Sequence, residues 1–253
     1  MLSKNKIKFI NSLFLKKNRD EQQLFCAEGE KCVLELLKTF ECKILVATND
    51  WLLSNSVHAE EIIIVENSEE IKKISFFKTP SPVFAVFKKP IFSFDIQDLK
   101  DDLTILLDGI QDPGNIGTII RIADWFGIRN IICAEQTVDV FNPKSIQSTM
   151  GALARVKVHY TKKDSFFKQL FSSKINIPIY GTFLEGENIY SSNLSKNGLI
   201  IMGNEGNGIA EDTKKYVSKK LFIPNYPKGV PTSESLNVAI ATGIVCSEFR
   251  RRL

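Results

Sequence analysis

Short apolar segments alternate with helical patterns from residue 103 to residue 222, and this alternation constrains the fold more than any other feature. Segments such as LTILLDG (103–109), NIICAE (130–135) and GLIIMG (198–203) have the length and composition of strands. They lack the polar alternation of a sheet with one face in water, which indicates that both faces are covered. The pattern predicts an α/β domain with a mostly parallel sheet and helices on both faces.

The first 90 residues repeat this pattern on a smaller scale. A strand and turn (QQLFCAEG) precede a helix (EKCVLELLKTF), and further apolar segments follow, with a second helix expected at 68–77. The segment at 91–102 has mixed polarity and no clear period, which is typical of a linker. We therefore expect a small α/β domain at 1–90, a linker at 91–102 and a larger domain at 103–253 of this 253-residue chain.

The stretch IIMGNEGNGI (200–209) places three glycines within six residues, directly after an apolar segment. Such a density favours close approach of the backbone to a ligand. The order G-x-x-G-x-G differs from the G-x-G-x-x-G of dinucleotide-binding folds, which argues against a Rossmann oxidoreductase. Ile209 and Ala210 stand where a P-loop needs Lys and Ser or Thr, and Glu205 would repel a phosphate. The expected ligand has no phosphate.

Two other polar loops follow strands of the same sheet, DGIQDPGNIG (108–117) and IPNYPKGVPTSESLN (223–237). Ligands of open α/β sheets bind beyond the carboxyl ends of the strands, so all three loops are candidates. In the first loop we expect Asn115 to cap a helix that ends at Gly127. Arg121 lies off the apolar stripe of that helix, and the ordinary interpretation is a solvated ion pair with Asp124.

The three loops together resemble the motifs of the SpoU-type (TrmH-like) RNA ribose 2′-O-methyltransferases of the SPOUT superfamily. The matching stretches are LLDGIQDPGNIGTIIRIADWFG, IIMGNEGNGI and LFIPNYPKGVPTSESLNVAIATGI. The resemblance covers roughly residues 103–253, and residues 1–90 resemble the small substrate-binding domain that often precedes this catalytic domain. It implies a C-terminal deep trefoil knot and a pocket for S-adenosylmethionine, which carries no phosphate.

The resemblance also assigns site residues, and no metal is among them. Arg121 would clamp the substrate phosphate and stabilise the developing alkoxide, while the other polar residues orient the substrate and the loops. The implied catalytic residues are Arg121, Asn115, Glu205, Ser235 and Asn237, and the implied cofactor-binding residues are Gly203, Asn204, Gly208, Ile223 and Leu236. Two departures from the family pattern occur: Ala239 stands where a Ser is frequent, and the loop at 224–235 is longer.

The implied function is methylation of a ribose 2′-hydroxyl in structured RNA, with ribosomal RNA favoured over transfer RNA. The alternative is a non-catalytic RNA-binding or ribosome-assembly protein that retains the knotted fold. Because a binder need not keep the five catalytic residues, and all five are present, we favour the enzyme. The small residues along 236–249 and the resemblance predict a homodimer with the last helix at its interface.

The first 19 residues carry six basic side chains and no acidic one: Lys4, Lys6, Lys8, Lys16, Lys17 and Arg19. Two interpretations stay open, namely a solvated amphipathic helix and an arm that contacts a polyanion such as RNA. A transit peptide is disfavoured, because the helical periodicity runs on into the next element without a cleavage-like break. Five scattered cysteines without a C-x-x-C pair indicate reduced thiols and a cytoplasmic protein. Two distant histidines make a His-based metal site improbable, and no apolar segment has the length of a membrane span.

Overall fold

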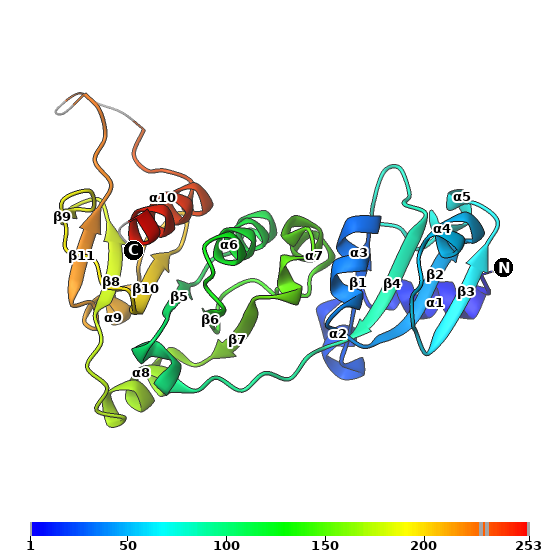
Figure 1. Cartoon of the computed structure of the whole chain (residues 1–253), viewed down its shortest axis with the longest axis horizontal. Helices are drawn as coiled ribbons and strands as arrows, with labels where there is room; N and C mark the ends of the chain where they lie inside the picture. The colour runs from blue at the N-terminus through cyan, green and yellow to red at the C-terminus, as the bar shows by residue number, and fades with distance from the viewer. Residues whose placement is uncertain (1, 228–229, 231–232, 252–253) are drawn as a thin grey trace. The chain divides into compact units, whose positions relative to one another are not determined.

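The computed structural model describes residues 2–227, 230 and 233–251. The chain divides into two compact units (Figure 1). Unit 1 comprises residues 1–91 and 139–154, and unit 2 comprises residues 92–138 and 155–253. The segment 139–154 therefore belongs to unit 1, although residues of unit 2 flank it in the sequence on both sides.

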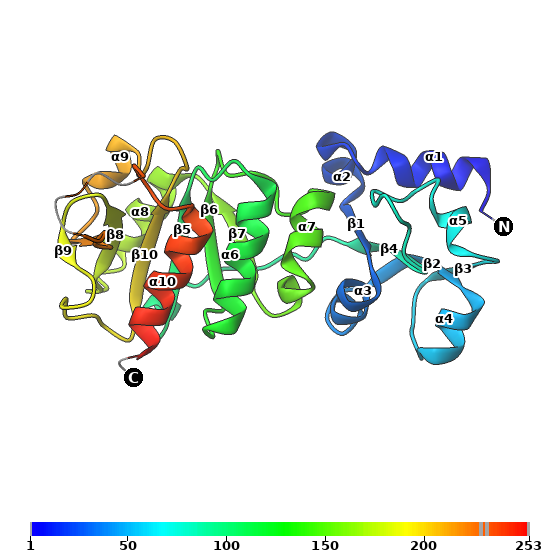
Figure 2. The ribbon, with the colours of Figure 1, turned by 90° about the horizontal axis from the view of Figure 1, so that it is seen from above.

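Unit 1 contains a mixed four-stranded sheet in the order β1-β4-β2-β3. Strands β1 and β2 are antiparallel to β4, and β3 is parallel to β2. Helices α1 and α2 lie on one face of this sheet and α3 and α4 on the other (Figure 2). The elements are α1 (Lys4–Ser12), α2 (Lys16–Gln22), β1 (Leu24–Glu28), α3 (Glu30–Leu37), β2 (Cys42–Thr48), α4 (Asn49–Ser54), β3 (Glu61–Val65), α5 (Ser68–Ile71) and β4 (Val83–Lys88). The expected helix at 68–77 is shorter in the structure, because α5 ends at Ile71.

Arg19 is the most deeply buried basic side chain of unit 1, with 1% of its surface exposed. Its Nη2 lies 2.7 Å from Asp139 Oδ2, and its Nη1 donates to the carbonyl oxygens of Leu13 and Phe14. A buried guanidinium requires such partners, because burial without them costs several kcal/mol. Arg19 is therefore a structural residue, and the expectation that all six N-terminal basic residues are solvated or face a polyanion is wrong at this position.

The segment 139–154 packs against β1 and α3 of unit 1. It contains α7 (Pro143–Thr149) and the short 3-10 helix η2 (Ala152–Ala154). The rings of Phe141 and Phe25 lie 4.9 Å apart, centre to centre. At Gly151, which has φ +87°, a Cβ would stand 2.5 Å from the Cβ of Glu35, so only glycine fits. These contacts make the segment part of the core of unit 1.

Unit 2 contains a seven-stranded sheet in the order β7-β6-β5-β10-β8-β11-β9, in which every described pair is parallel. Helices α6 and α10 cover one face and α8 and α9 the other (Figures 1 and 2). The elements are η1 (Ile96–Lys100), β5 (Leu103–Asp108), α6 (Pro113–Trp125), β6 (Asn130–Ala134), β7 (Lys157–Thr161), α8 (Lys163–Ser172), β8 (Ile179–Phe183), β9 (Glu187–Asn188), β10 (Gly198–Gly203), α9 (Glu211–Lys214), β11 (Lys219–Phe222) and α10 (Val238–Arg251). The predicted α/β architecture with a mostly parallel sheet is confirmed.

Strands β5 and β10 are neighbours, although 89 residues lie between the end of β5 and the start of β10. Their last residues, Asp108 and Gly203, pair with each other. The chain proceeds from β5 outward to β6 and β7, and β10 lies on the other side of β5. The strand order thus reverses between β5 and β10, which is where ligands of open α/β sheets bind. Residues 92–102 also pack into this unit, with Ile96 and Leu99 of η1 buried in its core. Within the described ranges no helix is long and apolar enough to cross a membrane.

The Arg19–Asp139 pair yields a prediction about stability. Asp139→Asn should lower the free energy of unfolding by about 3–5 kcal/mol, because it leaves the Arg19 charge buried without its counterion. Glu61→Gln is the control, since it breaks the more exposed Lys6–Glu61 pair and should cost less than about 1 kcal/mol. Urea-induced unfolding of the three proteins measures both values, and equal small losses would contradict the structural role of Arg19.

Candidate functional site

The loop after β5 places Asn115 in the first turn of α6. Asp112 caps this helix, because its Oδ1 accepts hydrogen bonds from the backbone N–H groups of Gly114 (2.7 Å) and Asn115 (2.9 Å), and Pro113 follows at the first helical position. The expectation that Asn115 is the cap is therefore wrong. Since Asp112 satisfies the backbone, the Asn115 side chain is available for contacts with other loops. The helix ends before Gly127, at φ +65°, as expected.

The glycine-rich loop after β10 closes on itself. Asn204 and Gly208 exchange backbone hydrogen bonds of 2.9 Å, and Asn204 Oδ1 accepts the N–H groups of Gly206 and Asn207. A Cβ on Gly203 would stand 2.3 Å from the carbonyl carbon of Gly208, and Gly208 itself has φ +67°. The loop thus needs glycine at 203 and 208 for its own turn, and the glycine density is not in itself evidence of a ligand.

Glu205 joins this loop to the loop after β5. Its carboxylate accepts hydrogen bonds from Asn115 Nδ2 (2.9 Å) and from the backbone N–H groups of Gln111 (3.2 Å) and Asp112 (3.3 Å). Burial by itself would raise the pKa of Glu205, but the hydrogen bonds, first that from Asn115, more than offset it, and the pKa lies below its ordinary value. The ionised carboxylate therefore stabilises the fold at neutral pH, and this contribution is lost as the pH falls through the lowered pKa.

Asn237 extends the connection to the loop before α10. Its Nδ2 donates to Asn115 Oδ1 over 3.0 Å, while its own Oδ1 accepts the N–H groups of Ala239 and Ile240 at the start of α10. The side chains of Glu205, Asn115 and Asn237 form a continuous hydrogen-bonded chain, which we call the three-loop network. It connects the three loops that the sequence singled out, at the edge where β5 and β10 end.

Arg121 lies on the exposed side of α6, six residues after Asn115, and has no hydrogen bond or ion pair to any described residue. Asp124 pairs instead with Arg155, whose Nε and Nη2 each lie 2.8 Å from its carboxylate oxygens. The expected Arg121–Asp124 pair is therefore wrong, and the guanidinium is available to an anion from solution. Ser235 is likewise exposed and has no hydrogen bond within the described ranges, so the structure does not bring it into the network.

The residues expected to hold the cofactor lie at the ends of β10 and β11 and before α10. Gly203 is the buried last residue of β10, Ile223 is half-buried after β11, and Leu236 is 48% exposed. Residues 203–210 contain no basic side chain, and Glu205 is negatively charged. This composition fits a cationic sulfonium without phosphates. The five residues that the motif resemblance predicts for S-adenosylmethionine stay a prediction: Gly203, Asn204, Gly208, Ile223 and Leu236.

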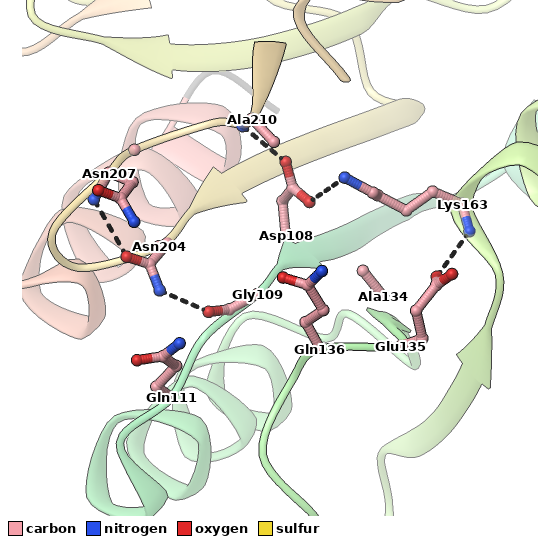
Figure 3. Close-up of a pocket in the computed structure, with 11 residues that line it drawn as sticks. Asp108, Gly109, Gln111, Ala134, Glu135, Gln136, Lys163, Asn204, Asn207 and Ala210 are labelled. Carbon is pink, nitrogen blue, oxygen red and sulfur yellow. Dashed lines mark hydrogen bonds and ion pairs between the residues drawn. The ribbon is translucent and has the colours of Figure 1, made fainter. Parts of the chain in front are cut away.

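A polar pocket opens beside the same edge of the sheet (Figure 3). Its cavity volume of ≈ 110 Å³ is smaller than the roughly 300–1,000 Å³ of typical small-molecule sites. The lining includes Asn204, Asn207 and Gly208 but neither Ile223 nor Leu236. Sequence reasoning missed two of its charged residues, Asp108 and Lys163, although an aspartate that ends a fully apolar strand is a recognisable signal. Among the described residues no group of three or more His, Cys, Asp or Glu side chains is placed to hold a metal ion.

Comparison with known proteins identifies the family. Residues 102–247, more than half of the chain, match the SpoU rRNA Methylase family, and residues 4–85 match the MRM3-like substrate binding domain. The chain belongs to the SpoU rRNA methylase family. The resemblance stated from the sequence motifs is thereby confirmed.

Three relatives of this SpoU rRNA methylase cover the chain almost completely. It is 28% identical over 247 residues to the 23S rRNA (guanosine(2553)-2′-O)-methyltransferase RlmP of Bacillus subtilis. This match covers 97% of this chain and 96% of RlmP. A TrmH-family structure from Porphyromonas gingivalis matches with 42% identity and TM-score 0.89 over 100% of both chains. The AdoMet-bound rRNA methyltransferase from Sinorhizobium meliloti matches with 28% identity and TM-score 0.85 over 100% of this chain and 97% of that one.

The three-loop network predicts different effects for two substitutions of Asn115. Asn115→Ala removes the link between Glu205 and Asn237 and should lower stability by about 1–3 kcal/mol. Asn115→Asp should be worse at pH 8, because it places a second carboxylate against Glu205, and should recover towards pH 5 as the pair takes up a proton. Thermal unfolding between pH 5 and pH 8 measures both variants. An Asn115→Asp protein that is no less stable at pH 8 than Asn115→Ala would contradict the hydrogen bond to Glu205.

Proposed function

We propose that this protein methylates a ribose 2′-hydroxyl in ribosomal RNA with S-adenosylmethionine as the methyl donor. The observation that carries the proposal is the three-loop network, because it joins residues of all three family motifs at the strand-order reversal between β5 and β10. The activity agrees with the family and with RlmP, whose name gives the same reaction on 23S rRNA. The bound AdoMet of the S. meliloti relative supports the cofactor.

The residues of this chain act mainly through positioning and charge. S-adenosylmethionine supplies an electrophilic methyl group when it is bound. Arg121 has no partner in the described chain, so its guanidinium can grip the phosphate beside the target ribose and stabilise the alkoxide as it forms. A guanidinium stays protonated in proteins, so we assign proton removal to water. Glu205 and Asn115 connect the glycine-rich loop to the start of α6, the helix that carries Arg121, and Ser235 and Asn237 belong to the third loop.

Ribosomal RNA is favoured over transfer RNA, because the family and RlmP are both named for rRNA. The competing proposal, a non-catalytic RNA-binding or ribosome-assembly protein, needs neither the three-loop network nor an arginine on α6 that pairs with no described residue. The deep trefoil knot implied by the motifs is also part of our proposal. We place the protein with its substrate in the cytoplasm.

We assign RNA binding outside the reaction centre to unit 1, whose residues 4–85 match a substrate binding domain. Four lysines of α1 and α2 are exposed and have no ion pair with any described residue: Lys4, Lys8, Lys16 and Lys17. Lys6 pairs with Glu61 and Arg19 is buried, so neither belongs to this set. Unpaired lysines bind phosphates with release of counterions, which makes RNA affinity fall with added salt.

The experiment that tests the function maps 2′-O-methyl groups in total RNA from cells with and without the gene. We expect one or a few ribosomal sites to lose methylation in its absence and to regain it with the wild-type gene. A variant with Lys16→Glu and Lys17→Glu should restore less methylation, because it replaces phosphate-binding charges with repulsive ones. Identical 2′-O-methylation maps in cells with and without the gene would contradict the proposed activity.

The same complementation separates the role of Arg121 from a role in folding. Arg121→Ala should lower the methylation rate by about 100-fold or more, as does loss of a donor to an oxyanion. It should leave thermal stability unchanged, because no described residue pairs with Arg121. Arg121→Lys should stay impaired, since it keeps the charge without the planar fork. Near-normal turnover of Arg121→Ala would contradict this mechanism while leaving the fold untouched.

We further propose that the protein is a homodimer. The layer formed by α6 and α10 exposes large apolar side chains at both of its ends, namely Leu236 (48%) and Ile240 (59%) at the start of α10 and Trp125 (85%) at the end of α6, near the last turn of α10. A second copy of the chain can cover this face in a two-fold, self-complementary arrangement. Sedimentation equilibrium at micromolar concentration should show a dimer that Ile240→Glu weakens. Leu53→Glu, at a more exposed apolar position of unit 1, should have no effect, and a monomeric wild type would refute the proposal.

A further inference from the structure

Asp108 is a buried carboxylate that none of the family motif assignments uses. It is the last residue of β5 and is only 4% exposed. One of its oxygens accepts the backbone N–H of Ala210 over 2.9 Å, and the other lies 3.1 Å from Lys163 Nζ (Figure 3). Asp108 therefore holds the far end of the glycine-rich loop, where the chain leaves residues 203–209 and enters α9.

Lys163 connects this carboxylate to two further elements. Besides Asp108, its Nζ contacts Asp212 Oδ1 (2.8 Å) and Thr213 Oγ1 (3.2 Å) in α9, and its backbone N–H donates to Glu135 Oε2 (3.0 Å) after β6. Its side chain is 17% exposed, so these partners replace most of its water. Burial opposes the charged form of Lys163, but the two carboxylates outweigh this, and its pKa is raised. The ammonium group stays charged at neutral pH.

The glycine-rich loop is thus held from two sides. On one side the amide of Asn204 donates to the carbonyl oxygen of Gly109 over 2.7 Å, and Glu205 contacts Asn115. On the other side the only described side-chain contact to the Ala210 backbone comes from Asp108. Without Lys163, the buried Asp108 carboxylate would lose its counterion and one of its oxygens would lose its only described partner, so we expect the side chain to turn towards water and release Ala210.

We propose that Lys163 is a positioning residue that holds the Ala210 end of the glycine-rich loop through Asp108 and thereby sets the affinity for S-adenosylmethionine. The inference rests on the proposed function, which assigns that loop to the cofactor. Lys163 itself touches neither substrate nor cofactor in this scheme. A site that is displaced by about 1 Å loses on the order of 100-fold in performance, so a distant contact of this kind has a measurable effect.

The test uses the full-length protein and four variants. Lys163→Met removes the charge at similar length, and Lys163→Arg restores it. Lys168→Met is the matched control, because Lys168 is an exposed lysine of the same helix with no partner among the described residues. Asp108→Asn weakens the connection without leaving Lys163 unpaired, since Asp212 remains. It replaces Lys163→Met in every measurement if that variant does not fold.

Three measurements are made on each protein: calorimetric binding of S-adenosylmethionine, the KM values for cofactor and RNA, and amide hydrogen exchange at residues 204–210. For Lys163→Met we expect cofactor binding weaker by on the order of tenfold or more, with the KM for RNA and the exchange of β5, β6 and β10 unchanged. Exchange at Ala210 should become faster. Lys163→Arg should recover most of the affinity, and Lys168→Met should match the wild type.

The outcomes separate this inference from the function on which it rests. Wild-type protein that does not bind S-adenosylmethionine refutes the proposed function, and the inference with it. Wild-type binding that is unchanged in folded Lys163→Met or Asp108→Asn overturns the inference alone. Equal losses of cofactor binding, RNA binding and exchange protection in all strands would show that Lys163 only stabilises the unit, and would also overturn it.

Discussion

The hydrogen bond between Glu205 and Asn115 is the interaction on which the candidate site depends. It joins two loops whose residues are 90 positions apart in the sequence, and it occupies the same amide that binds Asn237. A partly buried carboxylate stays ionised there because donors from Asn115 and from the backbone of Gln111 and Asp112 compensate for lost water. The carboxylate connects the glycine-rich loop to the first turn of α6, and Asn115 extends this connection to Asn237 at the start of α10.

A second constraint is that the segment 139–154 belongs to unit 1. The segment 139–154 lies within the sequence that matches the methylase family, yet it packs in unit 1. The buried pair of Arg19 with Asp139 and the contact of Phe25 with Phe141 hold it there. Family boundaries and compact units therefore differ in this protein. Removal of residues 1–90 would expose apolar surface on this segment, so RNA binding by unit 1 is better tested by changes of surface charge than by deletion.

Sequence reasoning was most successful where the signal is local and repeated. The apolar strands, their alternation with helices and the stop at Gly127 all follow from periodicity and backbone preference, and the structure has them. It was wrong where two partners competed for one group. Asp112 caps α6 in place of Asn115, and Arg155 takes the carboxylate of Asp124 that was expected to pair with Arg121. Arg155 is 31 residues from Asp124, and no local rule predicts which of two cations forms the ion pair with a carboxylate.

The sequence by itself determined the parallel α/β architecture, the three loops at one edge of the sheet and the membership of the methylase family, because these depend on patterns that recur along the chain. Only the tertiary structure decided how the loops are held. The glycines at 203 and 208 serve the loop's own turn, Arg19 is buried, and Asp108 with Lys163 supports the loop from the far side. The contacts of Asp108 with Ala210 and of Asn115 with Glu205 depend on the strand order, which brings β10 beside β5 and so places groups about 100 residues apart within hydrogen-bond distance. Such long-range electrostatic partners leave no periodic trace in the sequence.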